Sequence, residues 1–453
     1  MALSTRDHTT TRAADGLTQG ADLTVYTEAD PGTVAHALRP LLTGILGDPL
    51  PVRLELWDGS AVGPVGTAST LRVRSRDALR RLLWAPDELG LSRAYVMGDL
   101  DLEGDLFAAL ATLRDAVELD WRLAARVAPR ALVAARSVGA LGRPLEPPPE
   151  EARPRGRRHS RRRDAQAVSH HYDVGNDFYE LVLGPSMTYS CARFTSTDAT
   201  LEEAQAAKHD LVARKLGLHE RPGARLLDVG CGWGSMAIHA ARHHGAQVVG
   251  VTISREQAER ARDRVAAAGV ADLVTILEQD YRDLAGEQFD AISSIGMFEH
   301  VGRARMATYF RTLRSRLRAG GRLLNHAISS VDGSRLPRRS FTGRYVFPDG
   351  ELLDVGDVVL AMESAGFEVR DVESLREHYA RTLRGWVANL EAHWDRAVAL
   401  VGERRARIWR LYMAGSAIGF EDGGINVHQV LGVVPHADGR SEMPPTRDGW
   451  TTG

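Results

Sequence analysis

A glutamate and a histidine stand together where a stretch typical of a buried strand ends. Residues 289–295, FDAISSI, are mostly apolar or small, and the chain then turns at Gly296 and presents Glu299 and His300. Ligands bind at the carboxyl ends of the strands in parallel sheets, where a carboxylate can accept a hydrogen bond or a proton. The simpler interpretation of Glu299 alone is a carboxylate stabilised by the N-terminal dipole of a following helix.

A glycine-rich turn follows an earlier strand-like stretch. In ARLLDVGCGWG, Asp228 precedes Gly230, Gly232 and Gly234, and the pattern of a helix comes next. Glycines allow a tight turn and a close approach of the backbone to a ligand, although a purely structural turn is the alternative. The acid two residues before the first glycine resembles motif I of S-adenosylmethionine (SAM) methyltransferases more than the GxGxxG of dehydrogenases.

Polar side chains also follow the next two predicted strands. A dinucleotide-binding enzyme usually carries Asp or Glu after the second strand, whereas this chain has Thr252 and, on the next helix, Gln257. Asp280 and Tyr281 close the third strand, where they could flank an adenine. Because these residues lie at the carboxyl ends of adjacent strands, they predict a nucleotide site there.

The order of the elements predicts an α/β fold for the C-terminal part of the chain. From residue 166 onward, strand-like and helix-like segments alternate, which is typical of a doubly wound, mostly parallel sheet. The 453 residues exceed an ordinary single domain, so we expect two or three domains. We expect residues 1–22 to be disordered and residues 23–141 to form a smaller mixed domain. In that domain we expect a strand at 52–56, a returning strand at 70–75 and a helix at 76–84.

Two basic segments lie between these parts. Residues 119–141 are amphipathic and arginine-rich, and Pro129 should kink or split the helix. Packing on its own domain and lying on a membrane surface are the two interpretations of this helix. Residues 142–165 combine consecutive prolines with many arginines, which is typical of a linker, with an arm for anionic headgroups as the alternative. Nucleic-acid binding would use interleaved aromatic residues that this segment lacks.

Composition limits the class of protein. A hydrophobic content of 43% and a net charge of −2 are typical of a globular protein and argue against a general nucleic-acid binder. Only two cysteines are present, Cys191 and Cys231, so we expect no disulfide framework and a reducing, cytoplasmic compartment. We find neither a signal-peptide pattern nor an apolar run of about 18 residues. Lysine occurs only at 208 and 215, which we attribute to genomic base composition.

Seven segments, in order, closely resemble the cyclopropane fatty acid synthases, which are SAM-dependent enzymes acting on unsaturated acyl chains. The segments are HHYDVGNDFYELVLGPSMTYSCARF, LLDVGCGWGSMAIHAA, VVGVTISREQ, GMFEHVG, LLNHAIS, RYVFPDGEL and HYARTLRGW. The resemblance covers residues 166 to about 435. It implies a Rossmann-like class I SAM methyltransferase with a mostly parallel, seven-stranded sheet over residues 166–453. Residues 23–141 resemble, less strongly, the accessory lipid-binding domain of the phospholipid-acting members.

The resemblance also implies site residues. The positions that match the family's SAM contacts are Tyr189, Ser190, Gly230, Gly232, Thr252 and Gln257. The family holds a bicarbonate ion beside the sulfonium, and its ligands match Cys191, Glu299, His326, Ile328 and Tyr379. Many members carry Trp where this chain has Tyr281, which keeps an aromatic ring. Residues 410–420 are expected either to wall an acyl tunnel or to pack in the core.

The implied reaction is methyl transfer from SAM to the cis double bond of a phospholipid acyl chain. Direct loss of a proton from the new methyl group gives a cyclopropane. A hydride shift before that loss gives a 10-methylene chain, which a partner reductase could convert to 10-methylstearate. A small-molecule methyltransferase and a lipid-binding protein without activity remain the other interpretations. By resemblance we expect peripheral association with the inner face of the membrane and a homodimer, and we expect no nucleic-acid partner.

Overall fold

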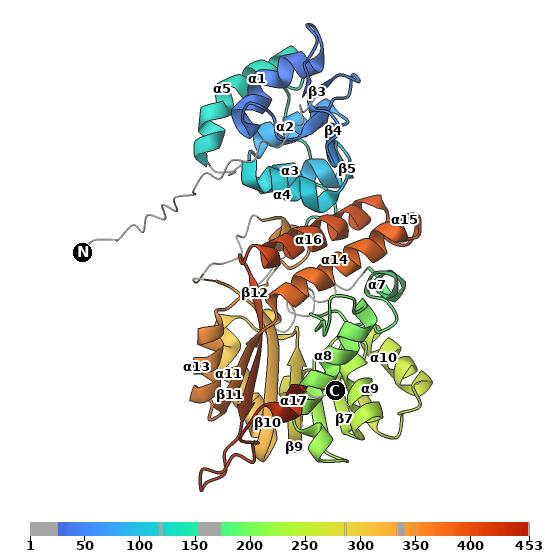
Figure 1. The fold of residues 1–453 in the computed structure, drawn as a ribbon, viewed down its shortest axis with the longest axis vertical. Coiled ribbons are helices and arrows are strands. Elements are labelled where there is room, and N and C mark those ends of the chain that lie inside the picture. Colours follow the sequence, from blue (N-terminus) through green and yellow to red (C-terminus); the bar gives the residue numbers. More distant parts are fainter. Residues whose placement is uncertain are drawn as a thin grey trace, which may run out of the picture.

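The computed structural model describes residues 26–116, 121–152, 174–284, 286, 288–331, 333, 340–348 and 350–451. These residues form a five-stranded and a seven-stranded sheet with their covering helices. In Figure 1 the N-terminal part rests on the helices α14 (Arg376–Ala392) and α16 (Glu403–Glu421), and the larger sheet lies beyond them. The predicted disordered residues 1–22 and the linker residues 153–165 lie outside the described residues.

The N-terminal sheet has the strand order β1-β3-β2-β4-β5. Its strands are β1 (Tyr26–Thr27), β2 (Arg53–Glu55), β3 (Ala61–Pro64), β4 (Ser69–Val73) and β5 (Leu100–Gly104). Its helices are α1 (Val34–Leu46), α2 (Arg76–Trp84), α3 (Glu88–Val96), α4 (Leu106–Ala116) and α5 (Trp121–Ser137).

The predicted hairpin in this sheet is wrong. The strand that returns from β2 is β3, and β4, which we expected to return, pairs with β2 in parallel. The sequence obscured β3 because it contains Gly63 and Pro64, which weaken a strand signal. The helix expected at 76–84 is confirmed as α2.

The basic helix is not split at its proline. Of the kink or split that we predicted at Pro129, the split is wrong, because α5 runs as one helix from Trp121 to Ser137. Its buried residues Leu123, Val127 and Ala134 belong to the core of the N-terminal part. Pro129 has no backbone N–H and so cannot donate a helical hydrogen bond, and the packing of the buried face offsets that loss.

The larger sheet confirms the predicted α/β fold. Its order is β11-β12-β10-β9-β6-β7-β8, with β10, β9, β6, β7 and β8 parallel to one another. Only β12 is antiparallel to its two neighbours among the described strands. The strands are β6 (Arg225–Val229), β7 (Gln247–Thr252), β8 (Val274–Glu278), β9 (Phe289–Ile295), β10 (Leu317–Ser329), β11 (Glu368–Ser374) and β12 (Asn426–Val433).

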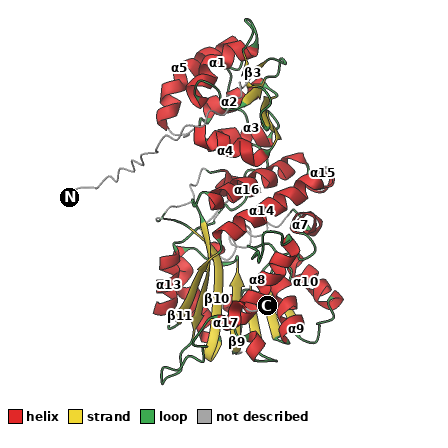
Figure 2. Cartoon of the chain, in the orientation of Figure 1, coloured by secondary structure: helices red, strands yellow, loops and turns green. Residues whose placement is uncertain are grey.

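Helices cover both faces of this sheet, as Figure 2 shows. One face packs on α8 (Leu201–Lys215), α9 (Ser235–His244) and α10 (Arg255–Ala267), and the other on α11 (Met306–Ser315) and α13 (Val355–Ser364). The remaining helices are α7 (Asn176–Leu183), α12 (Phe341–Tyr345), α15 (Trp394–Val401) and α17 (Asp448–Thr451). The short 3-10 helices are η1 (Leu218–Glu220), η2 (Tyr281–Asp283), η3 (Phe298–His300) and η4 (Arg303–Arg305).

The two parts of the molecule share a core and a buried ion-pair network. Tyr95 and Leu102 of the N-terminal part pack in one apolar cluster with Trp409 of α16. The guanidinium of Arg407, which is largely buried, donates to the Asp101 carboxylate at 3.0 Å and to the Tyr95 carbonyl at 3.1 Å. The N-terminal part is therefore held firmly on the helices that cover the larger sheet.

The described start of the predicted linker is bound to the N-terminal part rather than solvated. The Trp84 indole donates to the Gly142 carbonyl at 3.0 Å, and Arg93 makes two 2.9 Å hydrogen bonds to Glu151. The buried Glu151 carboxylate also lies 3.9 Å from Arg344 of α12, so this segment joins both parts. No described helix has the length and apolar run needed to cross a membrane.

Replacing Arg407 by alanine should destabilise the protein by about 2–3 kcal/mol, because the Tyr95 carbonyl and Asp101 lose a buried charged donor. Urea and thermal unfolding measure the change. The matched control is Arg440→Ala, since the Arg440–Asp438 pair is exposed and worth about 0.5 kcal/mol or less. Equal losses in the two variants would contradict a structural role for the buried network.

Candidate functional site

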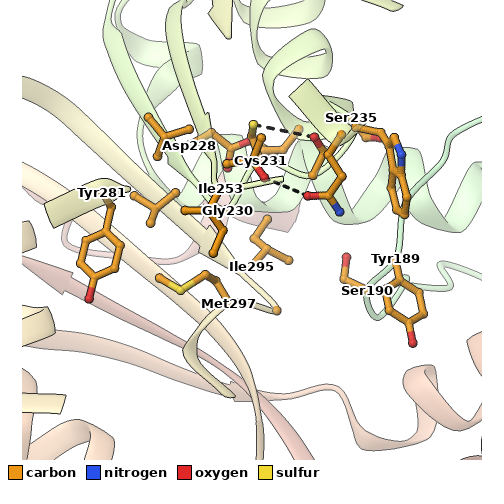
Figure 3. Close-up of a pocket in the computed structure, with 18 of the residues that line it drawn as sticks. Tyr189, Ser190, Asp228, Gly230, Cys231, Ser235, Ile253, Tyr281, Ile295 and Met297 are labelled. Carbon is orange, nitrogen blue, oxygen red and sulfur yellow. Dashed lines mark hydrogen bonds between the residues drawn. The ribbon is translucent and has the colours of Figure 1, made fainter. Parts of the chain in front are cut away.

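A pocket lies at the carboxyl ends of β6, β7, β8 and β9, under the segment 187–190. Tyr189 and Ser190 border it on one side and Tyr281 on the other, with Gly230 and Ile295 between them (Figure 3). All the predicted cofactor residues except Gly234 line it: Tyr189, Ser190, Asp228, Gly230, Gly232, Thr252, Gln257, Asp280 and Tyr281. The topology of the sheet brings together residues that lie almost a hundred positions apart in the chain.

The glycine turn takes conformations that favour glycine. Gly230 has a φ of 74°, and a Cβ there would lie 2.8 Å from the Met297 side chain, within the pocket wall. Gly234, with a φ of 80°, precedes the first residue of α9 and packs near Ala261 instead of lining the pocket. The turn therefore directs the N-terminus of α9 toward the pocket, where backbone amides and the helix dipole favour a negative group.

Asp228 offers one free carboxylate oxygen at the base of the pocket. Its Oδ1 accepts a hydrogen bond from Ser293 at 2.7 Å, whereas its buried Oδ2 has no partner among the described residues. Burial raises the pKa of Asp228 to about 6. The free oxygen can accept a hydrogen bond from the polar end of a ligand, which would also offset the desolvation of the carboxylate.

The other polar residues are held in place by their neighbours. Thr252 Oγ1 lies 2.9 Å from the Gln257 side chain, at the junction of β7 and α10. Asp280 receives two hydrogen bonds from the Arg282 side chain, which fix the carboxylate beside Tyr281. The Tyr281 ring meets the Tyr309 ring edge to face at 5.5 Å and presents an aromatic surface to the pocket.

Sequence reasoning missed Lys208, which lies in the wall of this pocket. Its side chain is 1% exposed, and Nζ donates to the Ser190 hydroxyl at 2.9 Å. Gln205, one turn earlier on α8, donates to the Ser190 carbonyl at 2.9 Å. The two side chains thus hold Ser190 at the pocket, and burial lowers the pKa of Lys208 to about 7.

The scarcity of lysine in the sequence, which we attributed to genomic base composition, could have drawn attention to Lys208. The chain has two lysines, 208 and 215, and both are 1% exposed, although lysine is almost never fully buried without a partner. Lys215 pairs with Asp371 at 2.8 Å at the far edge of the sheet. An ammonium is more compact than a guanidinium, so these two enclosed positions are ones where lysine and arginine need not be interchangeable.

A second group of predicted residues lies beside the pocket, among buried side chains. Glu299, on η3 just after β9, is buried, and its Oε1 accepts a 2.7 Å hydrogen bond from the Ile328 amide. Its buried Oε2 has no partner among the described residues. Burial raises the pKa of Glu299 to about 7. The Ile328 amide, which the resemblance assigned to an ion, is thus engaged by Glu299.

The strand next to β9, which is β10, contributes the buried side chain of His326 to this second group. It lies on β10 opposite Ile295, the last residue of β9, and its Nδ1 is 3.2 Å from the Gln429 side-chain nitrogen. With an amide donor at Nδ1, the neutral ring carries its proton on Nε2. Burial lowers the pKa of His326 well below its usual value, so the ring is neutral. Nε2 is a buried donor without a partner among the described residues.

Cys191 and Tyr379 complete the predicted set in different ways. The Cys191 thiol is fully buried and donates to the Ala192 carbonyl at 3.1 Å, and burial raises its pKa, so it stays protonated and is no nucleophile. Tyr379 lies on α14, with its ring 4.6 Å from that of Phe420 on α16. The covering helices therefore supply an aromatic wall next to the polar groups at the ends of the strands.

More aromatic rings surround Tyr189. Its ring lies 5.3 Å from that of Trp386, 5.6 Å from Tyr179 and 6.0 Å from Trp409. Aromatic faces attract cations, including a sulfonium or a carbocation. The site thus combines a nucleotide-type pocket, a cluster of aromatic rings and buried acid and imidazole groups, which suits transfer of a cationic group to an apolar acceptor.

Comparison with known proteins shows which family the chain belongs to. The family model described as mycolic acid cyclopropane synthetase matches residues 159–430. A probable fatty acid methyltransferase of Mycobacterium tuberculosis is 46% identical over 406 residues, which cover 87% of this chain and 93% of that protein. A tuberculostearic acid methyltransferase of the same organism is 34% identical, covering 84% and 87% of the two chains.

A solved structure extends the likeness to three dimensions. The crystal structure of mycolic acid cyclopropane synthase CmaA1 complexed with SAH and CTAB matches with a TM-score of 0.56 and 37% identity. The match covers 59% of this chain and 97% of the synthase. The predicted family and fold are confirmed: this chain belongs to the mycolic acid cyclopropane synthetase family and is a SAM-dependent methyltransferase.

Proposed function

We propose that this enzyme transfers the methyl group of SAM to the cis double bond of an unsaturated phospholipid acyl chain and forms a cyclopropane. The observation that carries the proposal is the pair of buried, unpartnered polar atoms, Glu299 Oε2 and His326 Nε2, next to aromatic walls. The names of the relatives, fatty acid methyltransferase and cyclopropane synthase, support a fatty acyl substrate.

The nucleotide pocket would bind SAM, which supplies an electrophilic methyl group. Asp228 and the N-terminus of α9 face the polar end of the ligand, and Tyr281 offers a ring for the adenine to stack on. Lys208 and Gln205 keep Ser190 in position to donate to the ligand. These residues orient the cofactor, and orientation lowers the barrier because the reacting atoms meet in a productive geometry.

The helices above the pocket would bind the acyl chain. An alkene has no group that donates a strong hydrogen bond, so its binding site must be apolar and exclude water. The buried residues Tyr412, Met413, Ala417 and Phe420 of α16 lie in the same cluster as Tyr379 of α14. These residues thus belong to the apolar cluster at the site, where in this proposal they would also wall an acyl tunnel.

The residues around Glu299 fit a small group that both donates and accepts, as bicarbonate does. Glu299 Oε2 is a buried acceptor and His326 Nε2 a buried donor, and each is costly to leave unpaired. We infer that these two atoms, with Cys191, Ile328 and Tyr379 around them, hold bicarbonate. When bound there, the ion would supply a base and a negative charge beside a cation on the acyl chain.

The alternative product is a 10-methylene chain, which a partner reductase would convert to a methyl branch. The likeness to a tuberculostearic acid methyltransferase favours it. Both products share the transfer of the methyl group and the loss of one methyl proton, and they differ by one hydride shift on the acyl chain. A small-molecule acceptor is a further alternative, and independence of activity from lipid vesicles would identify it.

The exposed surface of α5 favours a lipid in a membrane. Leu132 and Val133 are 58% and 71% exposed, and Arg126 and Arg130 of the same helix are also exposed. Basic and apolar side chains on one exposed helix bind anionic lipid surfaces. α5 packs on its domain through its buried face, and its exposed face supports the proposal of peripheral membrane association.

The purified enzyme with SAM and oleoyl-phospholipid vesicles should add one carbon to the acyl chain, seen by mass spectrometry of the methyl esters. NMR should show a ring, whereas an exocyclic methylene would establish the alternative product.

Glu299→Gln should lower kcat by about 10²-fold while SAM still binds. The matched control Glu363→Gln, on the exposed side of α13, should keep full activity. No added carbon with SAM bound would refute the proposal.

The stability of the protein should depend on the ionisation of Glu299. Its pKa in the folded protein, about 7, lies above the ordinary value of 4.5, so the contribution of the protonated Glu299 to stability is fully present below pH 4.5 and is lost as pH rises through 7. Glu299→Gln abolishes this loss. Between pH 5 and 8 the variant should therefore gain about 2–3 kcal/mol of unfolding free energy relative to wild type. A difference that is constant with pH would mean that Glu299 is not buried as described.

Replacing Lys208 by methionine should raise the Kd for SAM about tenfold, because Ser190 loses its charged donor. Lys208→Arg should also weaken binding, since a guanidinium is less compact than the ammonium at this enclosed position. Isothermal titration calorimetry gives the affinities. Lys215→Met is the control, an equally buried lysine at another edge of the sheet that should lose stability but keep SAM affinity. Equal loss of affinity in both methionine variants would contradict a specific role for Lys208.

A further inference from the structure

A hollow on the outer surface of α8 and α9 gathers imidazoles that the methyltransferase site does not use. The ionisable residues that line it are Asp210, Arg214, His219, His239, His243 and His244. None of them lines the SAM pocket. Figure 1 shows α8 and α9 next to each other, both covering the sheet from the same side.

Three of these side chains converge on one point. Asp210 on α8 and His239 and His244 on α9 each offer one ligand atom, and these atoms all lie within 4.8 Å of one another. His244 Nε2 lies 3.1 Å from Asp210 Oδ1. His239 Nε2 is buried and has no hydrogen-bond partner among the described residues. A buried imidazole nitrogen without a partner, next to a carboxylate and a second imidazole, lacks the group that would satisfy it.

We propose that Asp210, His239 and His244 bind a divalent transition metal ion of the zinc and nickel class. Two imidazole nitrogens and one carboxylate oxygen are donors that these ions prefer, whereas magnesium and calcium prefer oxygen ligands throughout. Ligand atoms at these separations need to close by about 1 Å to meet metal bonds of about 2.1 Å. His243, one helical turn from His239, has its ring 4.5 Å away and can supply a fourth ligand.

The charges around the hollow are compatible with this assignment. Arg214 donates to Asp210 Oδ2 at 2.6 Å, on the oxygen that faces away from His244, so Oδ1 remains available to a metal. Burial lowers the pKa of His239 to about 3 and also lowers that of His244. Both rings are therefore neutral at pH 7, and their lone pairs are free of protons. The nearby guanidinium opposes a second positive charge, which limits the affinity.

A metal at this position would tie two helices that hold the SAM pocket. α8 carries Lys208 and Gln205, which position Ser190, and α9 begins directly after the glycine turn. A metal bound by both Asp210 and His239 would join these two helices. Because the ion binds only the folded chain, it should raise the unfolding temperature.

The test uses the full-length protein without a histidine tag, stripped with a chelator and titrated with Zn²⁺ and Ni²⁺ by calorimetry. We expect one tight equivalent, a higher unfolding temperature and no response to Mg²⁺. His239→Gln and His244→Gln should each weaken binding about tenfold or more. Arg214→Gln should strengthen it, because a competing positive charge is removed.

Two controls separate this site from other histidines. His436→Gln changes a histidine that pairs with Glu442 and does not line the hollow, and a double variant of His170 and His171 removes a pair outside the described residues. Both controls should bind the metal as wild type does. Wild-type affinity in His239→Gln and His244→Gln, or loss only in the controls, would overturn the proposal. The Asp210 side chain is 33% exposed, so Asp210→Asn should fold even if the histidine variants do not, and it should also weaken metal binding.

Discussion

Burial of ionisable groups beside a cluster of aromatic and apolar side chains is the constraint on which the rest of this structure depends. Glu299, His326, Asp228 and Lys208 all lie in positions where water cannot solvate them. Each has a polar atom that is unpaired or held by a single bond among the described residues. Such groups cost free energy in the folded protein and are retained where a ligand completes their hydrogen bonds. The unpaired atom of Asp228 thus lies where the cofactor is expected, and in our proposal those of Glu299 and His326 hold a small ion.

The fold supplies the rigidity that this arrangement needs. The parallel strands end at one edge, so Asp228, Thr252 and Glu299 come together without any loop reaching far. α14 and α16 add aromatic rings beside these strand ends, and the N-terminal part packs on α16 through Arg407. The same contacts hold the N-terminal part, which includes the basic helix α5, on the helices next to the site.

The sequence predicted the parts of this structure that follow from local patterns. The regular alternation of strand-like and helix-like segments predicted the parallel sheet. Residues at the ends of its strands, such as Thr252 and Asp280, lie in the pocket because the carboxyl ends of parallel strands share one edge of the sheet. Elements decided by tertiary packing were missed: β3 carries Gly63 and Pro64, and α5 continues through Pro129 because its buried face is held by the core. Lys208 was missed because nothing local distinguishes a buried lysine from an exposed one. The cluster of Asp210 with His239 arises only where two helices meet.

The most direct test of the central claim is the fate of the methyl protons. The enzyme would be incubated with SAM carrying a trideuterated methyl group and with oleoyl-phospholipid vesicles, and the acyl product analysed by mass spectrometry. A cation on the acyl chain that loses a proton from the new methyl group leaves two deuterons in the product, whether it is a ring or a methylene. Retention of all three deuterons would mean ordinary methylation without that loss, and would contradict the assignment of the buried Glu299 and His326 to cation chemistry.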